Sequence, residues 1–405
     1  MSTPKKTKSE EEAVSNFREY LRCKTVHPDP DYEPAIKFLI RQAEEIGLEF
    51  KRFDLVERNP IAILTWPGKD PSLPSILLNS HMDVVPVFEE YWTHPPFDAH
   101  KTEDGKIYAR GSQDMKCVGI QYLEAIRHLK SNGHHCLRTI HMSFTPDEEV
   151  GSDKGMLALI NSGELKQFNI GFVLDEGLAS PTDTFILFNA ERAPWRLRVS
   201  CKGNTGHGSL LIENTAGEKL SKIMGKAFEF RRAQEEKLKS NPQLHIGEIA
   251  TVNLTIVEGG VLANVVPAEL TAVFDIRVPP TIPQKEFEQT ISDWVAAGGE
   301  GCSYEFTEKH SDQTITSIDD TSPWWRAFKG ACDKAKIHVE PRIFPAGTDS
   351  RFLRAAGYQA YGFSPMNNTP ILLHEHDEYL SEDVFLRGID IYSEILPAMA
   401  NVASH

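Results

Sequence analysis

Short apolar runs that alternate with helical segments constrain the fold of this chain more than any other feature of its sequence. A helical periodicity is found at residues 14–21, 35–46 and 118–129, and the short runs occupy residues 61–65, 75–80, 139–145 and 171–174. Strands that alternate with helices favour a mostly parallel sheet covered by helices on both faces. We therefore predict an α/β fold for this part of the chain.

The pattern changes after about Glu191. We predict, in order, a strand at 195–202, a helix at 215–239, strands at 250–257 and 269–277, a helix at 284–297 and a strand at 303–307. This β-α-β-β-α-β order is the split βαβ, or ferredoxin-like, arrangement. Because 405 residues exceed one ordinary hydrophobic core, we predict two domains. Residues 1–190 and 311–405 form a discontinuous first domain, and residues 191–310 form an inserted α+β domain.

Charge and composition argue against several partners. With 58 acidic and 43 basic side chains the net charge is −15, and such a field repels phosphate backbones and anionic membranes. We expect neither nucleic acid nor a membrane as partner. The first residues contain no apolar signal segment, and no run is long enough to span a bilayer. The six cysteines include no Cys-x-x-Cys pair, so we expect a soluble cytoplasmic protein without disulfides.

Five polar clusters lie at the ends of predicted strands or in the loops that follow them. They occupy residues 81–83, 114–116, 147–149, 175–176 and 374–376. In an open α/β sheet, functional sites form at the carboxyl edge of the strands, so these clusters can converge in space. Asp175 and Glu176 directly follow an apolar strand, which points a carboxylate at that edge.

Each cluster also has a simpler structural interpretation. His81 and Asp83 project to the same side of extended chain, so Asp83 can orient the imidazole for a metal, or the two can form an ordinary salt bridge. Asp114 stands before a predicted helix and could be its N-cap. Adjacent Glu148 and Glu149 repel each other unless a cation or a transferable proton separates their roles, but they could also form a surface turn.

The segment His374-Glu-His376-Asp-Glu378 has two histidines, either of which could be structural, and Glu378 could pair with a nearby base. Taken together, the clusters offer carboxylates and imidazoles without thiolate. This donor set suits zinc, and cobalt or manganese could substitute. Two such ions can share one bridging aspartate and hold a water of lowered pKa, while a free glutamate handles its proton.

The motifs Ser-His-Met-Asp-Val-Val-Pro, Gly-Ser-Gln-Asp-Met-Lys, Pro-Asp-Glu-Glu-Val-Gly and Leu-Leu-His-Glu-His-Asp-Glu occur in order along the chain. The chain thereby resembles a family of two-zinc amidohydrolases that contains the aminoacylases, carboxypeptidase G, peptidase T and succinyl-diaminopimelate desuccinylase. Met115, after the aspartate, is typical of the aminoacylase branch. The resemblance implies a zinc-exopeptidase-like catalytic domain that hydrolyses the amide bond of N-acyl-L-amino acids.

The resemblance also implies residue roles. Asp114 would bridge two zinc ions per subunit, with His81 and Glu176 on one ion and Glu149 and His374 on the other. Glu148 would be the general base and Asp83 the partner that orients His81. His376 is the second choice to His374, because His374 stands four residues before Glu378 as the family pattern requires.

The inserted domain resembles the family's lid and dimerisation domain, which implies a homodimer. His207 would stabilise the tetrahedral oxyanion in the active site of the other subunit, although a simple turn histidine between two glycines fits the sequence equally well. Asn264, Arg277 and Arg351 are candidates to bind the substrate, and Arg277 is the first choice because a guanidinium fork suits a carboxylate. Leu210, Leu211 and Ile212 are more apolar than the family leads us to expect.

Two other functions compete with hydrolysis of a small-molecule N-acyl amino acid. A dipeptidase or carboxypeptidase-like activity would use the same centre on a different amide. A catalytically inactive binding or scaffold protein would keep the fold, but it would have no chemical need for Glu148 beside a full ligand set.

Overall fold

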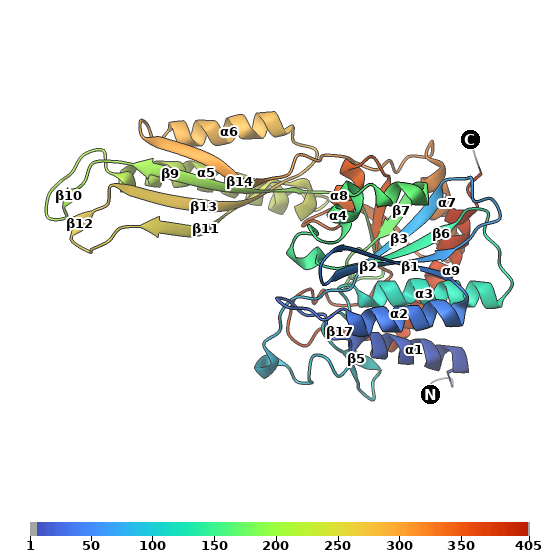
Figure 1. Ribbon diagram of the computed structural model, residues 1–405. Coiled ribbons are helices and arrows are strands. Elements are labelled where there is room, and N and C mark those ends of the chain that lie inside the picture. The colour runs from blue at the N-terminus through green and yellow to red at the C-terminus, as the bar shows by residue number, and fades with distance from the viewer. Residues whose placement is uncertain (1–5, 404–405) are drawn as a thin grey trace. The chain divides into compact units, whose positions relative to one another are not determined.

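The computed structural model describes residues 6–403, which form two compact units. The first unit comprises the chain up to Asn189, together with Thr316–Pro341 and the chain from Thr348 onward. The second unit comprises Ala190–Ile315 and Arg342–Gly347. Figure 1 shows both units.

An eight-stranded sheet organises the first unit, in the order β1-β2-β6-β3-β7-β16-β8-β15. Its centre is parallel, since β3 pairs in parallel with both β6 and β7, and β7 pairs in parallel with β16. Antiparallel pairs join β1 to β2, β2 to β6, and β16 to β8. The strands are β1 (Glu49–Val56), β2 (Asn59–Trp66), β3 (Ser75–His81), β6 (Ile140–Thr145), β7 (Ile170–Asp175), β8 (Phe185–Glu191), β15 (Val339–Phe344) and β16 (Ala360–Phe363).

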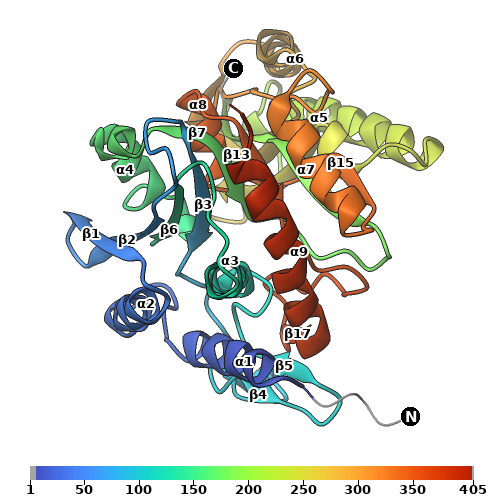
Figure 2. The ribbon, with the colours of Figure 1, turned by 90° about the vertical axis from the view of Figure 1, so that its right-hand side faces the viewer.

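Helices cover both faces of this sheet, as Figure 2 shows. Successive side chains of a strand point to opposite faces, so Ile76 and Leu78 of β3 join one apolar core and Leu77 joins another. The first core lies under α1 (Lys8–Leu21), α2 (Glu33–Ile46), α3 (Lys116–Ser131), α7 (Pro323–Lys334) and α9 (Glu382–Ala400). The second lies under α4 (Met156–Asn161) and α8 (Ser350–Ala355). These two cores confirm the predicted α/β class.

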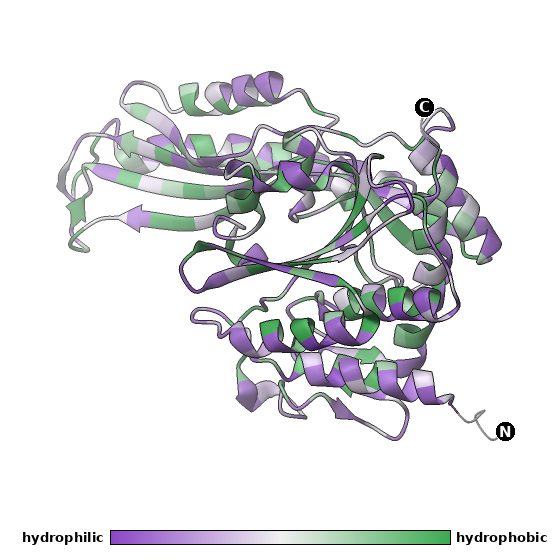
Figure 3. Ribbon diagram, turned by 45° about the vertical axis from the view of Figure 1, so that its right-hand side comes forward, coloured by the Kyte–Doolittle hydropathy of each residue, from purple (hydrophilic) through white to green (hydrophobic). Residues whose placement is uncertain are grey.

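The ends of the outer helices follow from their sequences. Thr7 accepts a hydrogen bond from the Glu10 amide while the Glu10 side chain accepts from the Thr7 amide, so α1 begins with a capping box. Gly47 ends α2 in the left-handed conformation that glycine adopts without strain. In Figure 3 the outer helices alternate apolar and polar bands, which is the pattern of helices with one face on a core.

A four-stranded antiparallel sheet, in the order β11-β13-β9-β14, organises the second unit. Its strands are β9 (Ala193–Lys202), β11 (Thr251–Gly259), β13 (Glu269–Val278) and β14 (Cys302–Lys309), and its helices are α5 (Ala216–Ser240) and α6 (Gln284–Ala296). The element order β9-α5-β11-β13-α6-β14 is the predicted split βαβ arrangement. Trp195 and Phe274 pack under the helices, whereas Arg277 lies at an alternate position on the opposite face.

The boundaries differ from the expected ones after residue 310. The second unit also takes residues 311–315 and Arg342–Gly347. Arg192 donates two hydrogen bonds to the Pro345 carbonyl, at 2.8 and 2.6 Å, and Gly247 lies against the backbone of Ile343. These contacts between residues distant in sequence left no local signal. The strands β1, β8 and β15 and the long helix α9 were not predicted from the sequence either.

Three smaller strands, β17 (Tyr379–Ser381), β5 (Lys106–Tyr108) and β4 (His100–Lys101), form a separate sheet in the first unit. A two-stranded ladder joins β10 (Gly206–His207) to β12 (Val265–Val266) in the second unit. Between residues 6 and 403, the structure contains no helix long and apolar enough to cross a membrane. All six cysteines are free thiols.

Candidate metal centre

The carboxyl ends of three neighbouring strands bring the predicted residues together. β3 ends at His81, which lies opposite Thr145, the last residue of the parallel strand β6. Glu148 and Glu149 follow β6 on a short turn, and Glu176 follows β7 on the other side of β3. Asp114 comes from the loop before α3, and His374 from the loop before β17.

Asp114 lies between the two histidines. Its Oδ1 is 3.1 Å from His81 Nε2, and its Oδ2 is 3.3 Å from His374 Nε2. His81 Nε2 is also 3.6 Å from Glu176 Oε1, and His374 Nε2 is 3.1 Å from Glu149 Oε2. One carboxylate with an oxygen toward each histidine is the arrangement that a bridging ligand needs. Asp114 does not cap α3, whose N-cap is Met115.

Two overlapping groups of donor atoms could hold ions. In the first, His81, Asp114 and Glu149 each offer an atom within 4.8 Å of the others, and in the second His81, Glu148 and Glu176 do. Glu148 Oε2 is 3.9 Å from His81 Nε2, on the Glu176 side. Distance alone therefore does not distinguish Glu148 as a base from Glu148 as a ligand.

The electrostatics of the cluster show an excess of buried negative charge. Burial and the charge of Glu176 raise the pKa of Glu148 well above its usual value, and burial and Asp114 raise the pKa of Glu149 to about 7. Burial also raises the pKa of Asp114, but hydrogen bonds with His374 and His81 outweigh it and lower that pKa. Hydrogen bonds to Asp114 and Glu149 raise the pKa of His374 to about 10.

This charge excess fits bound cations. Five carboxylates, those of Asp83, Asp114, Glu148, Glu149 and Glu176, stand around His81 and His374 and are all buried or nearly so. Glu149 Oε1 is buried without a hydrogen-bond partner among the residues that the structure describes. Buried carboxylates without compensation are costly, and metal coordination is one way of satisfying them. The residues present therefore suit bound divalent cations.

Asp83 organises more of the site than the sequence suggested. Its backbone carbonyl is 2.9 Å from His81 Nδ1, and its side-chain Oδ1 is 3.4 Å from the same nitrogen. Its two carboxylate oxygens accept hydrogen bonds from the amides of Glu148 and Glu149, both at 3.1 Å. His27, which the sequence analysis missed, lies 2.8 Å from Asp83 Oδ2. Asp83 thus joins the His81 strand end to the glutamate turn.

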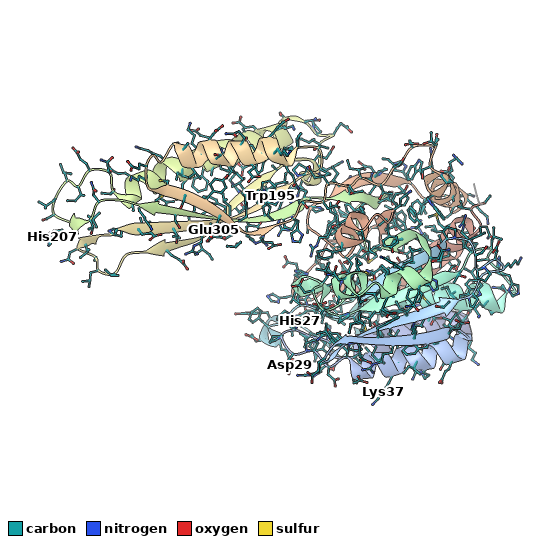
Figure 4. The ribbon with its side chains drawn as sticks, turned by 45° about the horizontal axis from the view of Figure 1, so that its top comes forward. His27, Asp29, Lys37, Trp195, His207 and Glu305 are labelled. Carbon is teal, nitrogen blue, oxygen red and sulfur yellow. The ribbon has the colours of Figure 1, made fainter. Side chains whose placement is uncertain are left out.

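The other predicted residues lie elsewhere. His207 and Asn264 neighbour each other in the second unit, where the Gly208 amide donates to the Asn264 carbonyl. His207 is exposed and hydrogen-bonds Ser209, and Figure 4 labels it at the tip of that unit. Arg277 donates to the Asp275 carboxylate at 2.9 and 3.2 Å. His376 packs beside Tyr91, with 5.1 Å between ring centroids.

Arg351 belongs to the first unit, near the start of α8, and its guanidinium lies over the Phe352 ring at 4.6 Å. Its Nε is buried without a hydrogen-bond partner within residues 6–403.

Several residues around the centre had no clear sequence signal. Arg110, Gln113 and Glu378 form buried contacts between the loops that carry Asp114 and His374. Glu378 was expected from the family pattern that selects His374 and, from its own chemistry, to pair with a nearby base, and it does accept from Arg110 Nη1 at 2.8 Å. The other contacts join positions more than 250 residues apart, which a single sequence does not reveal.

Comparison with known proteins agrees with this geometry. The chain is 53% identical to aminoacylase-1 of Mus musculus over 400 residues, covering 99% of this chain and 98% of that protein. It is also 53% identical to aminoacylase-1 of Sus scrofa over 393 residues, covering 97% and 96%.

Solved structures share the fold. The crystal structure of the Bacillus subtilis YXEP protein, a dinuclear metal binding peptidase from the M20 family, superposes with a TM-score of 0.69 at 16% identity, and the match covers 98% of this chain and 100% of that one.

Residues 77–398 match the sequence profile of peptidase family M20/M25/M40. This match spans most of the chain and includes the whole ligand cluster. The chain therefore belongs to peptidase family M20/M25/M40.

Proposed function

We propose that this protein hydrolyses the amide bond of N-acyl-L-amino acids and releases a carboxylate and a free L-amino acid. The observation that carries the proposal is the position of Asp114 between His81 and His374, with Glu148, Glu149 and Glu176 around them. The high identity to two aminoacylases over nearly the whole chain supports this choice of amide.

The centre would hold two zinc ions per subunit, for which cobalt or manganese could substitute. His81 and Glu176 would bind one ion, Glu149 and His374 the other, and Asp114 both. This set of imidazole and carboxylate donors without thiolate suits zinc. Such an ion pair supplies a water of lowered pKa and polarises the scissile carbonyl.

Glu148 is the proposed general base. Asp83 accepts from the Glu148 amide and so fixes the turn that carries this side chain. Glu148 Oε2 takes a proton from the attacking water and hands it to the leaving nitrogen, which departs as an amine.

The second unit is proposed to contribute substrate contacts and dimerisation. Arg277, on the sheet face opposite α5 and α6, offers a guanidinium fork for the substrate carboxylate, and Asn264 is a further proposed contact. Arg351, which belongs to the first unit, is proposed as another. His207 would stabilise the oxyanion in the partner subunit's site. Four exposed apolar side chains around β10 and β12 support self-association in this region, namely Leu210, Leu211, Val261 and Leu262.

We also infer a reducing compartment, the cytoplasm, because the six thiols are free and five of them are buried.

Turnover of N-acetylmethionine by the zinc-loaded protein tests the proposal. Dipeptides should compete as poorer substrates. Absence of turnover by folded protein that holds two ions would overturn the proposed reaction, and a preference for dipeptides would favour a dipeptidase. Absence of turnover on both substrates would favour a binding or scaffold role.

A further inference from the structure

Two loops distant in sequence carry Asp114 and His374. The aspartate loop comprises Arg110–Asp114, and the histidine loop comprises Pro370–Tyr379. Arg110 and Glu378, which connect the two loops, are 268 positions apart. Because they are so far apart in the chain, the distance from Asp114 to His374 depends on tertiary contacts, and the contacts made directly between the two loops are the most immediate of these.

Glu378 holds the aspartate loop through an array of hydrogen bonds. Its Oε2 accepts from Arg110 Nη1 at 2.8 Å and from the Gly111 amide at 3.1 Å. Its Oε1 accepts from the amides of Gln113 and Asp114, at 2.6 and 3.3 Å. The Glu378 side chain is fully buried and Arg110 is 2% exposed. A buried carboxylate with this many donors holds one orientation, and with it the backbone of the loop.

Gln113 holds the histidine loop in return. Its Nε2 donates to the carbonyls of Tyr379 and Pro370, at 2.8 and 3.1 Å. Its Oε1 accepts from the Leu372 amide at 3.1 Å. Arg110 Nη2 adds a hydrogen bond to the carbonyl of His374 itself, at 3.3 Å. Each loop therefore provides a buried side chain that fixes the backbone of the other.

Arg110 reaches the His374 backbone directly, while Asp377, further along the histidine loop, accepts hydrogen bonds from the Thr93 amide and hydroxyl, both at 2.7 Å. The His374 side chain is half exposed. It has φ 62°, in the left-handed region that L side chains rarely adopt. The ion-pair contacts of its imidazole are with Asp114 and Glu149, the other proposed ligands at its position.

The geometry points to Arg110, Gln113 and Glu378 as a reciprocal clamp that places His374 against Asp114 and thereby sets the affinity of one ion of the pair. These are positioning residues, since they act through the backbone and do not touch the reacting atoms. The inference rests on the proposed two-ion centre. It predicts a selective effect, on the ion at Asp114, Glu149 and His374 rather than the one at His81 and Glu176.

Zinc titration of the full chain, stripped with a chelator and monitored by calorimetry, tests the clamp. Gln113→Met keeps the approximate volume and removes three hydrogen bonds, and Glu378→Gln removes the charge. Each should weaken one of two zinc affinities about 10- to 100-fold, the usual effect of losing a partner that orients a ligand, and leave the other unchanged.

Glu124→Gln is the matched control, because Glu124 is another buried carboxylate of the first unit, bound to Asn16 and Arg127 and to neither loop. It should leave both zinc affinities unchanged. His374→Ala provides the reference for loss of the same ion. Adding Gln113→Met to His374→Ala should weaken that ion no further, because the clamp works by placing His374.

The outcomes separate the inference from the proposed function. Binding of fewer than two ions by the unaltered protein contradicts the two-ion centre. Two ions with unchanged affinities in folded Gln113→Met protein overturn the clamp, and so does equal weakening of both ions. A further tenfold loss in the double variant also overturns it. If Glu378→Gln does not fold, Gln113→Met decides the question, since it buries no unpaired charge.

Discussion

Glu148→Gln should abolish most of the activity while both ions stay bound. The exchange leaves the side-chain volume nearly unchanged and replaces a proton-accepting oxygen with an amide nitrogen. The backbone of the turn should not move, because the Glu148 and Glu149 amides both donate to Asp83, which the exchange does not alter. The proposed ligands His81, Asp114, Glu149, Glu176 and His374 also remain.

The size of the effect follows from the role. A positioned general base contributes about 10²- to 10⁴-fold to a rate, which corresponds to about 3 to 5 kcal/mol of transition-state stabilisation. Because the base acts only as the proton moves, kcat and kcat/KM should fall by the same factor and KM should stay constant. Loss at the upper end of this range is expected, since the Glu148 side chain is only 9% exposed, and the other carboxylates of the cluster are proposed ligands or, in the case of Asp83, accept hydrogen bonds from backbone amides.

Steady-state hydrolysis of N-acetylmethionine, together with metal analysis of the same sample, measures both effects. Glu149→Gln is the control, and it should lose an ion as well as activity. If Glu148→Gln instead loses an ion and Glu149→Gln keeps both, the two roles are reversed, an outcome that the donor group of His81, Glu148 and Glu176 leaves open. A kcat within tenfold of the unaltered enzyme would refute the assignment of Glu148 as the base.

Three further predictions concern stability and assembly. Burial lowers the pKa of His141 to about 4, below the unfolded value of about 6.5. Its contribution to the free energy of unfolding is therefore complete above pH 6.5 and is lost as pH falls toward 4, because only the unfolded chain binds the proton in this range. His141→Gln should remove roughly 3 kcal/mol of this pH dependence, measured by urea unfolding at each pH, and equal slopes for both proteins would contradict it. Phe274→Ala should cost about 3–5 kcal/mol, because Phe274 is 1% exposed in the core of the second unit, whereas Val273→Ala on the opposite face should cost far less in the same assay. Mixing His207→Ala with Glu148→Gln subunits should restore part of the activity if sites are shared between subunits, and no recovery from mixed dimers would exclude that sharing.

The strands of the first unit could be predicted from the sequence because a strand buried on both faces requires a short, continuous run of apolar residues. Ile76, Leu77 and Leu78 form a continuous apolar run, and the structure sends them alternately into two cores. The order of elements in the second unit was also predicted from the sequence, because apolar residues recur at a different spacing in strands than in helices. Residues 342–347 were misplaced because their partners, such as Arg192, are far away in sequence.

The candidate ligands were found because strand ends at one edge of a parallel sheet must lie close together. His81 ends one of three neighbouring strands, Glu149 and Glu176 follow the other two, and a local motif marked each of them. Their roles came from family resemblance. The structure adds the distances between these side chains. Because Glu148 and Glu149 both lie in donor groups with His81, an experiment must distinguish the general base from the ligand.

By itself, the sequence determined the class of fold, the order of elements and the kinds of donor atom available, because periodicity and side-chain chemistry are local properties. The tertiary structure alone decided which backbone groups each buried carboxylate meets. Glu378 carries no local sign that it binds the amides of Gly111, Gln113 and Asp114, and Asp83 carries none that it binds those of Glu148 and Glu149. Such contacts depend on the packing of loops far apart in the chain, so only the folded molecule specifies them.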